Sequence, residues 1–198
     1  MRIGLKIVIA FSVLALPACD DKEYADLLGG GQGSSDLNNV IAGDGFCGPQ
    51  GGREALGSAS FNSGVTTAKI DTDGNPLMEG HDATWQADTS GHVNGQAVNS
   101  VQYAYVVMSI SQIDARGVAL GDWATVTNAA SGKTVFARVE DKGPPGGTGE
   151  ISQAAASAVG IQYLPSSATV GDPSVIVEAY AGTSSIQGDC SQSVATNS

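Results

Sequence analysis

Short runs of alternating apolar and polar residues, separated by turn-forming residues, dominate the sequence from position 65 to 180. β-branched, aromatic and aliphatic residues at this spacing predict strands over 65–70, 101–110, 122–127, 133–139 and 173–180. Turns are predicted at 71–76 and 128–132, which are rich in Asp, Asn and Gly. Residues 151–160 are alanine-rich, and Ser152 can cap a short helix there. Many short strands with one or two helices predict a mostly β domain built as a small barrel.

The segment 139–152 combines carboxylates with residues that break regular structure. Four glycines and two prolines lie between Asp141 and Glu150, so this stretch is predicted to be a loop. Asp141 is expected to follow the strand 133–139, and Glu150 to precede the helix. Two anchored carboxylates beside an open loop are what acid/base hydrolysis of a glycosidic bond requires. A solvated acidic loop with Glu150 starting the helix is the alternative. Alternation along the strand from Lys133 would place Glu140 on the face opposite Asp141.

The first 18 residues have the features of a secretory signal peptide. Basic residues at positions 2 and 6 precede an apolar run over 7–16, and a small residue, Ala18, ends the segment. Cys19 follows directly, which resembles a bacterial lipoprotein box and implies acylation of Cys19 after cleavage. Ordinary cleavage nearby, leaving Cys19 as a free thiol, is the alternative. We expect a secreted, cell-surface or periplasmic protein, anchored through Cys19 to a bacterial membrane.

The remaining chain divides by composition. Residues 19–40 contain a Gly/Ser-rich run and are predicted to be a flexible linker, residues 41–190 the globular domain, and residues 191–198 a disordered tail. The chain has three cysteines. If Cys19 carries lipid, Cys47 and Cys190 remain as a pair, which in an exported protein predicts a disulfide. Two unpaired thiols are the alternative.

The charge balance limits the partners. The formal net charge is −11, and loss of two basic residues with the signal peptide leaves 7 basic and 20 acidic residues, or −13. A chain this acidic lacks the basic face that nucleic-acid binding needs. It suits a cationic ligand, because an acidic cleft concentrates cations. General solubility of a secreted protein explains the same charge, and the charge taken alone favours that explanation. We expect a monomer.

Other candidate motifs are weak. Asp71 and Asp73 lie in a D-x-D-G-N sequence that resembles the start of a calcium loop, but the rest of an EF-hand is missing. The two histidines have no zinc-ligand spacing, and no dinucleotide or phosphate loop is present. We therefore predict no metal and no cofactor. Three aromatic residues could stack on sugars or belong to the core: Tyr105, Trp85 and Trp123.

Taken in order, several segments resemble the family 75 glycoside hydrolases, which are endo-acting chitosanases known chiefly from fungi. The matching segments are Ile-Asp-Thr-Asp-Gly at 70–74, Trp-Gln-Ala-Asp-Thr-Ser at 85–90, Tyr-Val-Val-Met at 105–108, Gly-Asp-Trp-Ala-Thr-Val at 121–126, Val-Glu-Asp at 139–141 and Gly-Glu-Ile-Ser-Gln-Ala at 149–154. The resemblance implies a six-stranded double-psi-like β-barrel and inverting hydrolysis of β-1,4 links in chitosan. The family's essential carboxylates fall on Asp141 and Glu150, in either order of acid and base.

We expect the polycationic substrate to contact five acidic or polar residues: Asp71, Asp73, Gln86, Asp88 and Thr89. The chain departs from the family after Asp141, where Lys-Gly-Pro-Pro follows. That segment resembles the Asp-x-Gly-Pro of septal-ring lytic transglycosylases and expansin-like barrels. Two alternatives therefore stay open: a non-catalytic glycan-binding lipoprotein, and a peptidoglycan lytic transglycosylase.

Overall fold

The computed structural model describes residues 48–93, 95–164, 167–189 and 194–195 of the 198-residue chain. Contacts divide the chain into two units, Met1–Gly33 and Ser34–Ser198, and all described residues belong to the second. The predicted signal peptide and linker, and the three cysteines, lie outside the described residues. No helix in the described part of the chain has the length and hydropathy of a membrane span.

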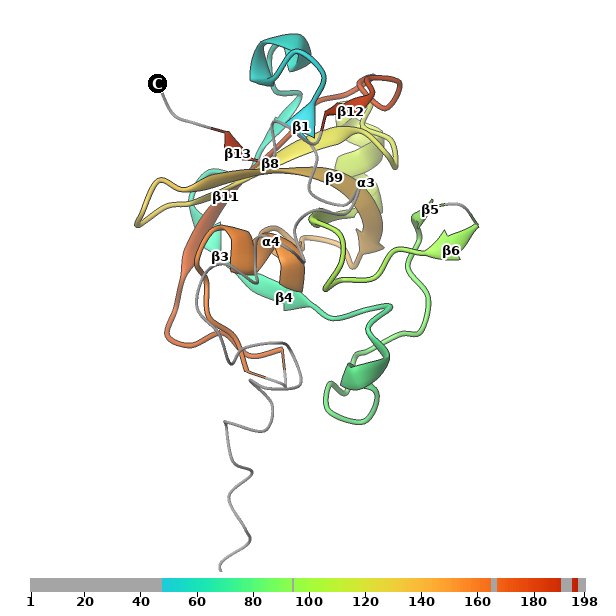
Figure 1. The fold of residues 1–198 in the computed structure, drawn as a ribbon, viewed down its shortest axis with the longest axis vertical. Helices are drawn as coiled ribbons and strands as arrows, with labels where there is room; N and C mark the ends of the chain where they lie inside the picture. The colour runs from blue at the N-terminus through green and yellow to red at the C-terminus, as the bar shows by residue number, and fades with distance from the viewer. Residues whose placement is uncertain (1–47, 94, 165–166, 190–193, 196–198) are drawn as a thin grey trace, which may run out of the picture. The chain divides into compact units, whose positions relative to one another are not determined.

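Nine strands form one mixed sheet (Figure 1). Seven of them follow the order β2-β11-β8-β9-β7-β10-β4, while β3 pairs with β11 and β13 pairs with β9. Their bounds are β2 Phe61–Asn62, β3 Thr66–Thr67, β4 Lys69–Asp71, β7 Tyr105–Ser109, β8 Trp123–Asn128, β9 Thr134–Gly143, β10 Glu150–Ser152, β11 Ser174–Ala179 and β13 Val194–Ala195. The last of these lies within the predicted disordered tail.

Two small two-stranded sheets and four helical segments complete the described part of the chain. The sheets pair β1 with β12 and β5 with β6. The bounds are β1 Gly48–Pro49, β12 Gly188–Asp189, β5 His92–Val93 and β6 Gln96–Ala97 for the strands, and η2 Arg53–Leu56, η3 Pro76–Met78, α3 Ile110–Arg116 and α4 Gln153–Ala158 for the helices.

The prediction of a mostly β fold is confirmed, but the predicted barrel closure is not seen. The strand predicted over 65–70 is two strands, and only Ala68 separates them. Its first half, β3, pairs with β11, and its second half, β4, pairs with β10. Neither half pairs on both sides among the described residues, so the sheet curls without closing.

The two faces of the central strands have different surroundings. On β7 and β9, Val106 and Val139 belong to the main buried core, together with Ile70 and Ile151. The buried alanines of α4 pack into the same core. The alternate residues of β7, Tyr105 and Val107, form a separate cluster with Val98 on the other face. Because side chains alternate along a strand, one face of the sheet is core and the other is available to build a site.

The predicted helix over 151–160 is confirmed as α4, with Ser152 as its N-cap. The Ser152 hydroxyl accepts a hydrogen bond from the Ala155 N–H at 3.1 Å, which satisfies one of the free amides at the helix start. The helix α3 was not predicted, since no element was assigned to residues 111–121. Its sequence signals are a capping box, in which Ser109 and Gln112 bond each other's backbone, and a left-handed Gly117 at its end.

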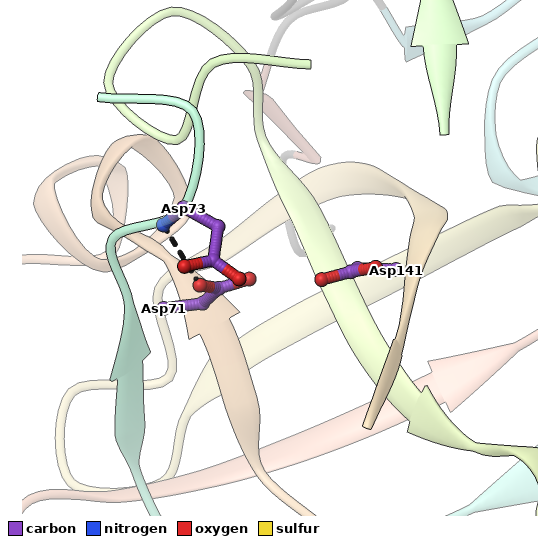
Figure 2. Close-up of side chains that lie close together, drawn as sticks. All are labelled: Asp71, Asp73 and Asp141. Atoms are coloured by element: carbon purple, nitrogen blue, oxygen red, sulfur yellow. Dashed lines mark hydrogen bonds between the residues drawn. The ribbon is translucent and has the colours of Figure 1, made fainter. Parts of the chain in front are cut away.

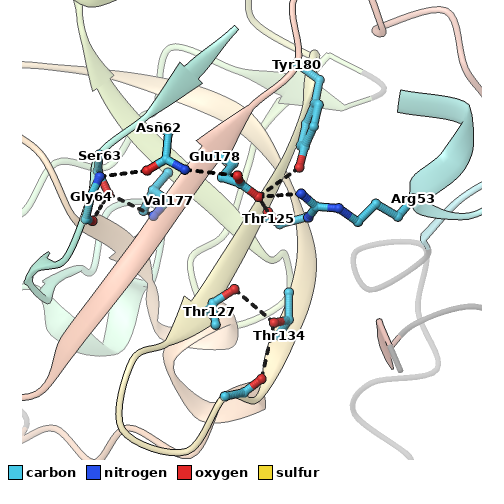
Figure 3. Close-up of polar contacts among 11 residues, drawn as sticks. Arg53, Asn62, Ser63, Gly64, Thr125, Thr127, Thr134, Val177, Glu178 and Tyr180 are labelled. Atoms are coloured by element: carbon cyan, nitrogen blue, oxygen red, sulfur yellow. Dashed lines mark hydrogen bonds and ion pairs between the residues drawn. The ribbon is translucent and has the colours of Figure 1, made fainter. Parts of the chain in front are cut away.

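Glu178 on β11 holds the N-terminal part of the domain against the sheet (Figure 3). Its carboxylate accepts hydrogen bonds from Arg53 at 2.7 Å, Asn62 at 3.0 Å, Tyr180 at 3.0 Å and Thr125 at 3.4 Å. The Arg53 guanidinium also lies over the Tyr180 ring, 5.5 Å from its centre. Since every partner belongs to the scaffold, this carboxylate is structural.

Candidate functional site

Asp141 and Glu150 lie on either side of Val107, on three neighbouring strands. Val107 of β7 is the register partner of Asp141 in the parallel β7–β9 ladder and of Glu150 in the antiparallel β10–β7 ladder. Register partners point to the same face of a sheet. Two strand spacings put the Cα atoms of the two acidic residues roughly 9–10 Å apart. The sheet therefore holds both carboxylates on one face, with Val107 of the middle strand between them.

A β-bulge at Glu140 places Asp141 on this face. Val139 pairs with Val106, but the next partner of β7, Val107, pairs with Asp141, so Glu140 is an extra residue in β9. Regular alternation would have sent Asp141 into the core with Val139. Asp141 was predicted to follow a strand that ends at position 139, but β9 continues to Gly143. The alternation argument that separated Glu140 from Asp141 fails at the bulge.

Glu150 is fixed by the short loop before it and by its own strand. It starts β10, and its register partner in β4 is Lys69. The preceding residue, Gly149, has φ +78°, and a Cβ there would lie 2.6 Å from Thr66 Cγ2 and from the Thr67 carbonyl oxygen. Only glycine fits this position without displacing β3. The glycine-rich loop thus allows β10 to lie close beside the 66–71 segment.

Three buried aspartates from distant parts of the chain converge (Figure 2). Asp71 ends β4 and Asp73 lies in the turn that follows, and both point toward Asp141 on β9. Each of the three offers a carboxylate oxygen, and these oxygens lie within 4.8 Å of one another. The sequence predicted each residue as functional, but it did not predict that Asp71 and Asp73 would meet Asp141. We call these three residues the aspartate cluster.

Hydrogen bonds from the backbone fix the aspartate cluster. The Asp73 N–H donates to Asp71 Oδ1 at 2.9 Å, and the Gln86 N–H donates to Asp73 Oδ1 at 2.6 Å. Asp141 Oδ1 accepts from the N–H groups of Ser90 and Lys142, both at 2.8 Å. Backbone donors hold a carboxylate in place without adding a countercharge.

A buried tyrosine holds the aspartate cluster through a hydrogen bond. Tyr105 is fully buried on β7, and its hydroxyl donates to Asp71 Oδ2 at 3.0 Å. The Tyr105 N–H in turn donates to the Ser152 hydroxyl at 3.0 Å. The sequence left open whether Tyr105 stacks on a sugar or belongs to the core. Its burial supports the core position, from which its hydroxyl holds Asp71.

Burial and mutual repulsion perturb the acidic residues. Burial raises the pKa of Asp71 to about 7, and the charges of Asp73 and Asp141 add to the rise against the hydrogen bonds that Asp71 accepts. Burial also raises the pKa of Asp73 to about 6 despite the Gln86 hydrogen bond. Burial also raises the pKa of Glu150. The charge of Lys69 opposes this rise, and the charge of Asp141 adds to it. Perturbed carboxylates on one face are typical of a functional site.

Glu140 lies close to the same face. A Cβ on Gly91 would collide with the Glu140 carboxylate and backbone, so this side chain packs directly against the loop that carries Ser90. Burial raises the pKa of Glu140 to about 7, with Arg138 opposing. The bulge that exposes Asp141 to the site therefore also leaves a second perturbed carboxylate beside it.

The other predicted substrate contacts take different positions. Thr89 is buried, and its hydroxyl donates to the Gly91 carbonyl oxygen and accepts from the Val98 N–H, both at 2.9 Å. It therefore shapes the loop. Asp88 is exposed, and its Oδ1 lies 3.0 Å from His92 Nε2. The Gln86 side chain is exposed, while its N–H holds Asp73.

A cavity of about 430 Å³ adjoins Glu150. It is lined by Ala68, Lys69, Ile70, Thr84, Glu150, Ser167, Ala168 and Thr169. Sequence reasoning identified only Glu150 in this group. The others gave no signal, since hydroxyl and alanine residues far apart in the sequence carry no motif, and β4 and β10 become neighbours only in the folded chain.

The aspartate cluster can attract a cation. Carboxylate oxygens are the ligands that hard metal ions such as Ca²⁺ and Mg²⁺ prefer, and an ammonium group would meet the same acceptors. The absence of a metal stays a prediction. No family model matches this chain, and no curated protein shows significant sequence similarity to it.

Proposed function

We propose that this protein is an endo-acting glycoside hydrolase that cleaves β-1,4 links of chitosan by an inverting mechanism. The observation that carries the proposal is the shared register partner of Asp141 and Glu150. Side chains on the same face of strands two apart can bring their carboxyl groups to the separation of about 6.5–9.5 Å that inverting hydrolysis uses to fit a water between acid and base.

We assign the acid role to Glu150 and the base role to Asp141. The raised pKa of Glu150 favours a protonated carboxyl that can give its proton to the leaving glycosidic oxygen. Asp141, held by two N–H donors, would take a proton from the attacking water. The C1–O bond to the leaving sugar breaks, and the water oxygen bonds to C1 from the opposite side. Asp141 then releases its proton to solvent, and Glu150 takes one up from solvent.

The aspartate cluster gives this site a preference for amino sugars. Three carboxylates with oxygens within 4.8 Å repel one another, and the rise in the pKa of Asp71 is partly this repulsion. A glucosamine ammonium between them would relieve it, since an opposite charge within about 4–6 Å favours the ionised carboxylate. Chitosan carries one such ammonium on each deacetylated sugar.

The test is a chitosan digest followed by measurement of new reducing ends, with EDTA present so that no metal contributes. We expect the wild type to release them, and Asp141→Asn and Glu150→Gln to lose at least about a hundredfold in rate. The matched control is Asp114→Asn, a similar change at an exposed position on α3, which should retain activity. Binding of the polymer without cleavage by the wild type would contradict the proposal in favour of a glycan-binding protein.

We extend the proposal to the family, the fold type and the location of the protein. The mixed parallel and antiparallel pairing around β7 and β10 supports a relationship to family 75 and its double-psi-like barrels. The cysteine after a signal-like segment supports export as a lipid-anchored protein, and we propose that this protein is a monomer. Metabolic labelling with palmitate tests the anchor, because the label should disappear in Cys19→Ser.

A further inference from the structure

The cavity beside Glu150 differs in its residues from the aspartate cluster. None of Asp71, Asp73 and Asp141 lines it, although Glu150 does. Its volume of about 430 Å³ falls within the range of ligand-binding pockets. Glu150 thus borders two different chemical environments, and a polymer placed across this carboxylate would lie in both.

The walls of the cavity are tied to the turn that carries Asp73. Asp82 Oδ2 accepts from the Thr72 hydroxyl at 2.8 Å, and Asp82 Oδ1 accepts from the N–H and hydroxyl of Thr84 at 2.9 and 2.8 Å. The Ser167 hydroxyl also bonds Asp82. These bonds, led by the Thr84 N–H, lower the pKa of Asp82 although burial alone would raise it. The cavity is therefore preformed around an ionised anchor.

The cavity lining includes a cationic side chain, unlike the aspartate cluster. Lys69, the register partner of Glu150, lies in the cavity lining, and its ammonium opposes the effect of burial on the pKa of Glu150. A glucosamine ammonium here would meet the Lys69 ammonium as well as Glu150 and the Asp82 anchor, whereas at the aspartate cluster it would meet three carboxylates. Like charges across a contact discriminate against a ligand.

The remaining lining groups suit an uncharged sugar. Ala168 is exposed and adds a methyl group, while Ala68 and Ile70 border the cavity but belong to the buried core. The hydroxyl of Thr84 already donates to Asp82, and that of Thr169 donates to the Gly171 carbonyl oxygen at 3.2 Å. Their oxygens keep lone pairs that can accept hydrogen bonds from an amide N–H or a sugar hydroxyl.

We propose that this cavity is a subsite for an N-acetylated sugar, with Lys69 as the residue that excludes glucosamine from it. The inference rests on the proposed chitosan hydrolysis and narrows its substrate to partly acetylated chains. In the preferred substrate, a glucosamine lies at the aspartate cluster and an N-acetylglucosamine lies in the cavity, with Glu150 between the two sugars.

The test is digestion of partly acetylated chitosan, with mass-spectrometric sequencing of the new ends. We expect N-acetylglucosamine to be enriched on one side of the cut. Lys69→Gln should reduce this enrichment by about two- to fivefold, the size expected for one exposed charge, and should speed cleavage of fully deacetylated chitosan. Lys133→Gln, at an exposed position outside the lining, should change neither.

Two outcomes would overturn the inference while leaving the proposed hydrolysis intact: ends of equal acetylation from the wild type, or an unchanged enrichment in Lys69→Gln. A second measurement needs no catalysis. Titration of the domain with di-N-acetylchitobiose should shift the backbone NMR signals of Thr84, Ala168 and Thr169, and unshifted signals would refute the subsite even if the protein cleaves no chitosan.

Discussion

Asp71 shows how burial converts an ordinary carboxylate into a pH-sensitive group. It is 7% exposed, and its pKa rises from a usual value of 3.8 to about 7 because burial and two neighbouring aspartates disfavour its charge. A folded-state pKa above the unfolded value means that the folded state binds the proton more tightly. The stability linked to Asp71 is therefore complete below pH 3.8 and is lost as the pH rises through about 7.

Replacing Asp71 with asparagine should make this pH dependence smaller. Each unit of pKa shift is linked to about 1.4 kcal/mol, so we expect the wild type to lose a few kcal/mol between pH 4 and pH 8, with Asp73 and Glu140 contributing. Urea unfolding at several pH values measures the loss. Asp71→Asn should lose clearly less, while Asp114→Asn should match the wild type. Equal slopes for all three proteins would show that Asp71 does not titrate in this range.

At the scale of elements, the features that depend on local sequence were predicted, and those that depend on long-range strand pairing were not. The strands over 122–127, 133–139 and 173–180 correspond to β8, β9 and β11, because alternation and turn residues are local properties. The bulge at Glu140 could not be predicted, since it is defined only by the pairing of β9 with β7, which lies about thirty residues earlier. The convergence of Asp71 with Asp141 depends on the same pairing.

The turn before β10 gives a prediction with a matched control. Gly149 and Gly146 have nearly the same positive φ, +78° and +79°, but only Gly149 is crowded by β3. Gly149→Ala should therefore displace β10 and cost about 2–4 kcal/mol of folding stability, with a large loss of chitosan cleavage. Gly146→Ala should cost about 1 kcal/mol and keep activity. Thermal unfolding and a reducing-end assay compare them, and similar losses for both would mean that backbone strain alone is responsible.

At the scale of the whole molecule, β1 and β12 bring residues near the two ends of the predicted domain together. Gly48 pairs with Asp189 and Pro49 with Gly188 in an antiparallel ladder, and the Gln50 N–H donates to the Gln187 carbonyl oxygen at 2.8 Å. Cys47 and Cys190 directly adjoin the Gly48–Asp189 pair in sequence. Although both cysteines lie outside the described residues, this register supports the predicted disulfide between them.

We expect non-reducing peptide mapping of the exported protein to recover Cys47 and Cys190 in one cross-linked peptide. The bond would close a loop of about 140 residues, for which chain entropy gives roughly 4–5 kcal/mol. Reduction, or the double change Cys47→Ser with Cys190→Ser, should therefore lower the unfolding temperature by several degrees. Because β1 and β12 form a sheet of their own and do not pair with the strands that carry Asp141 and Glu150, activity below that temperature should persist. Free thiols at both positions in the exported protein, or a variant with unchanged stability, would show that the β1–β12 ladder holds without a covalent link.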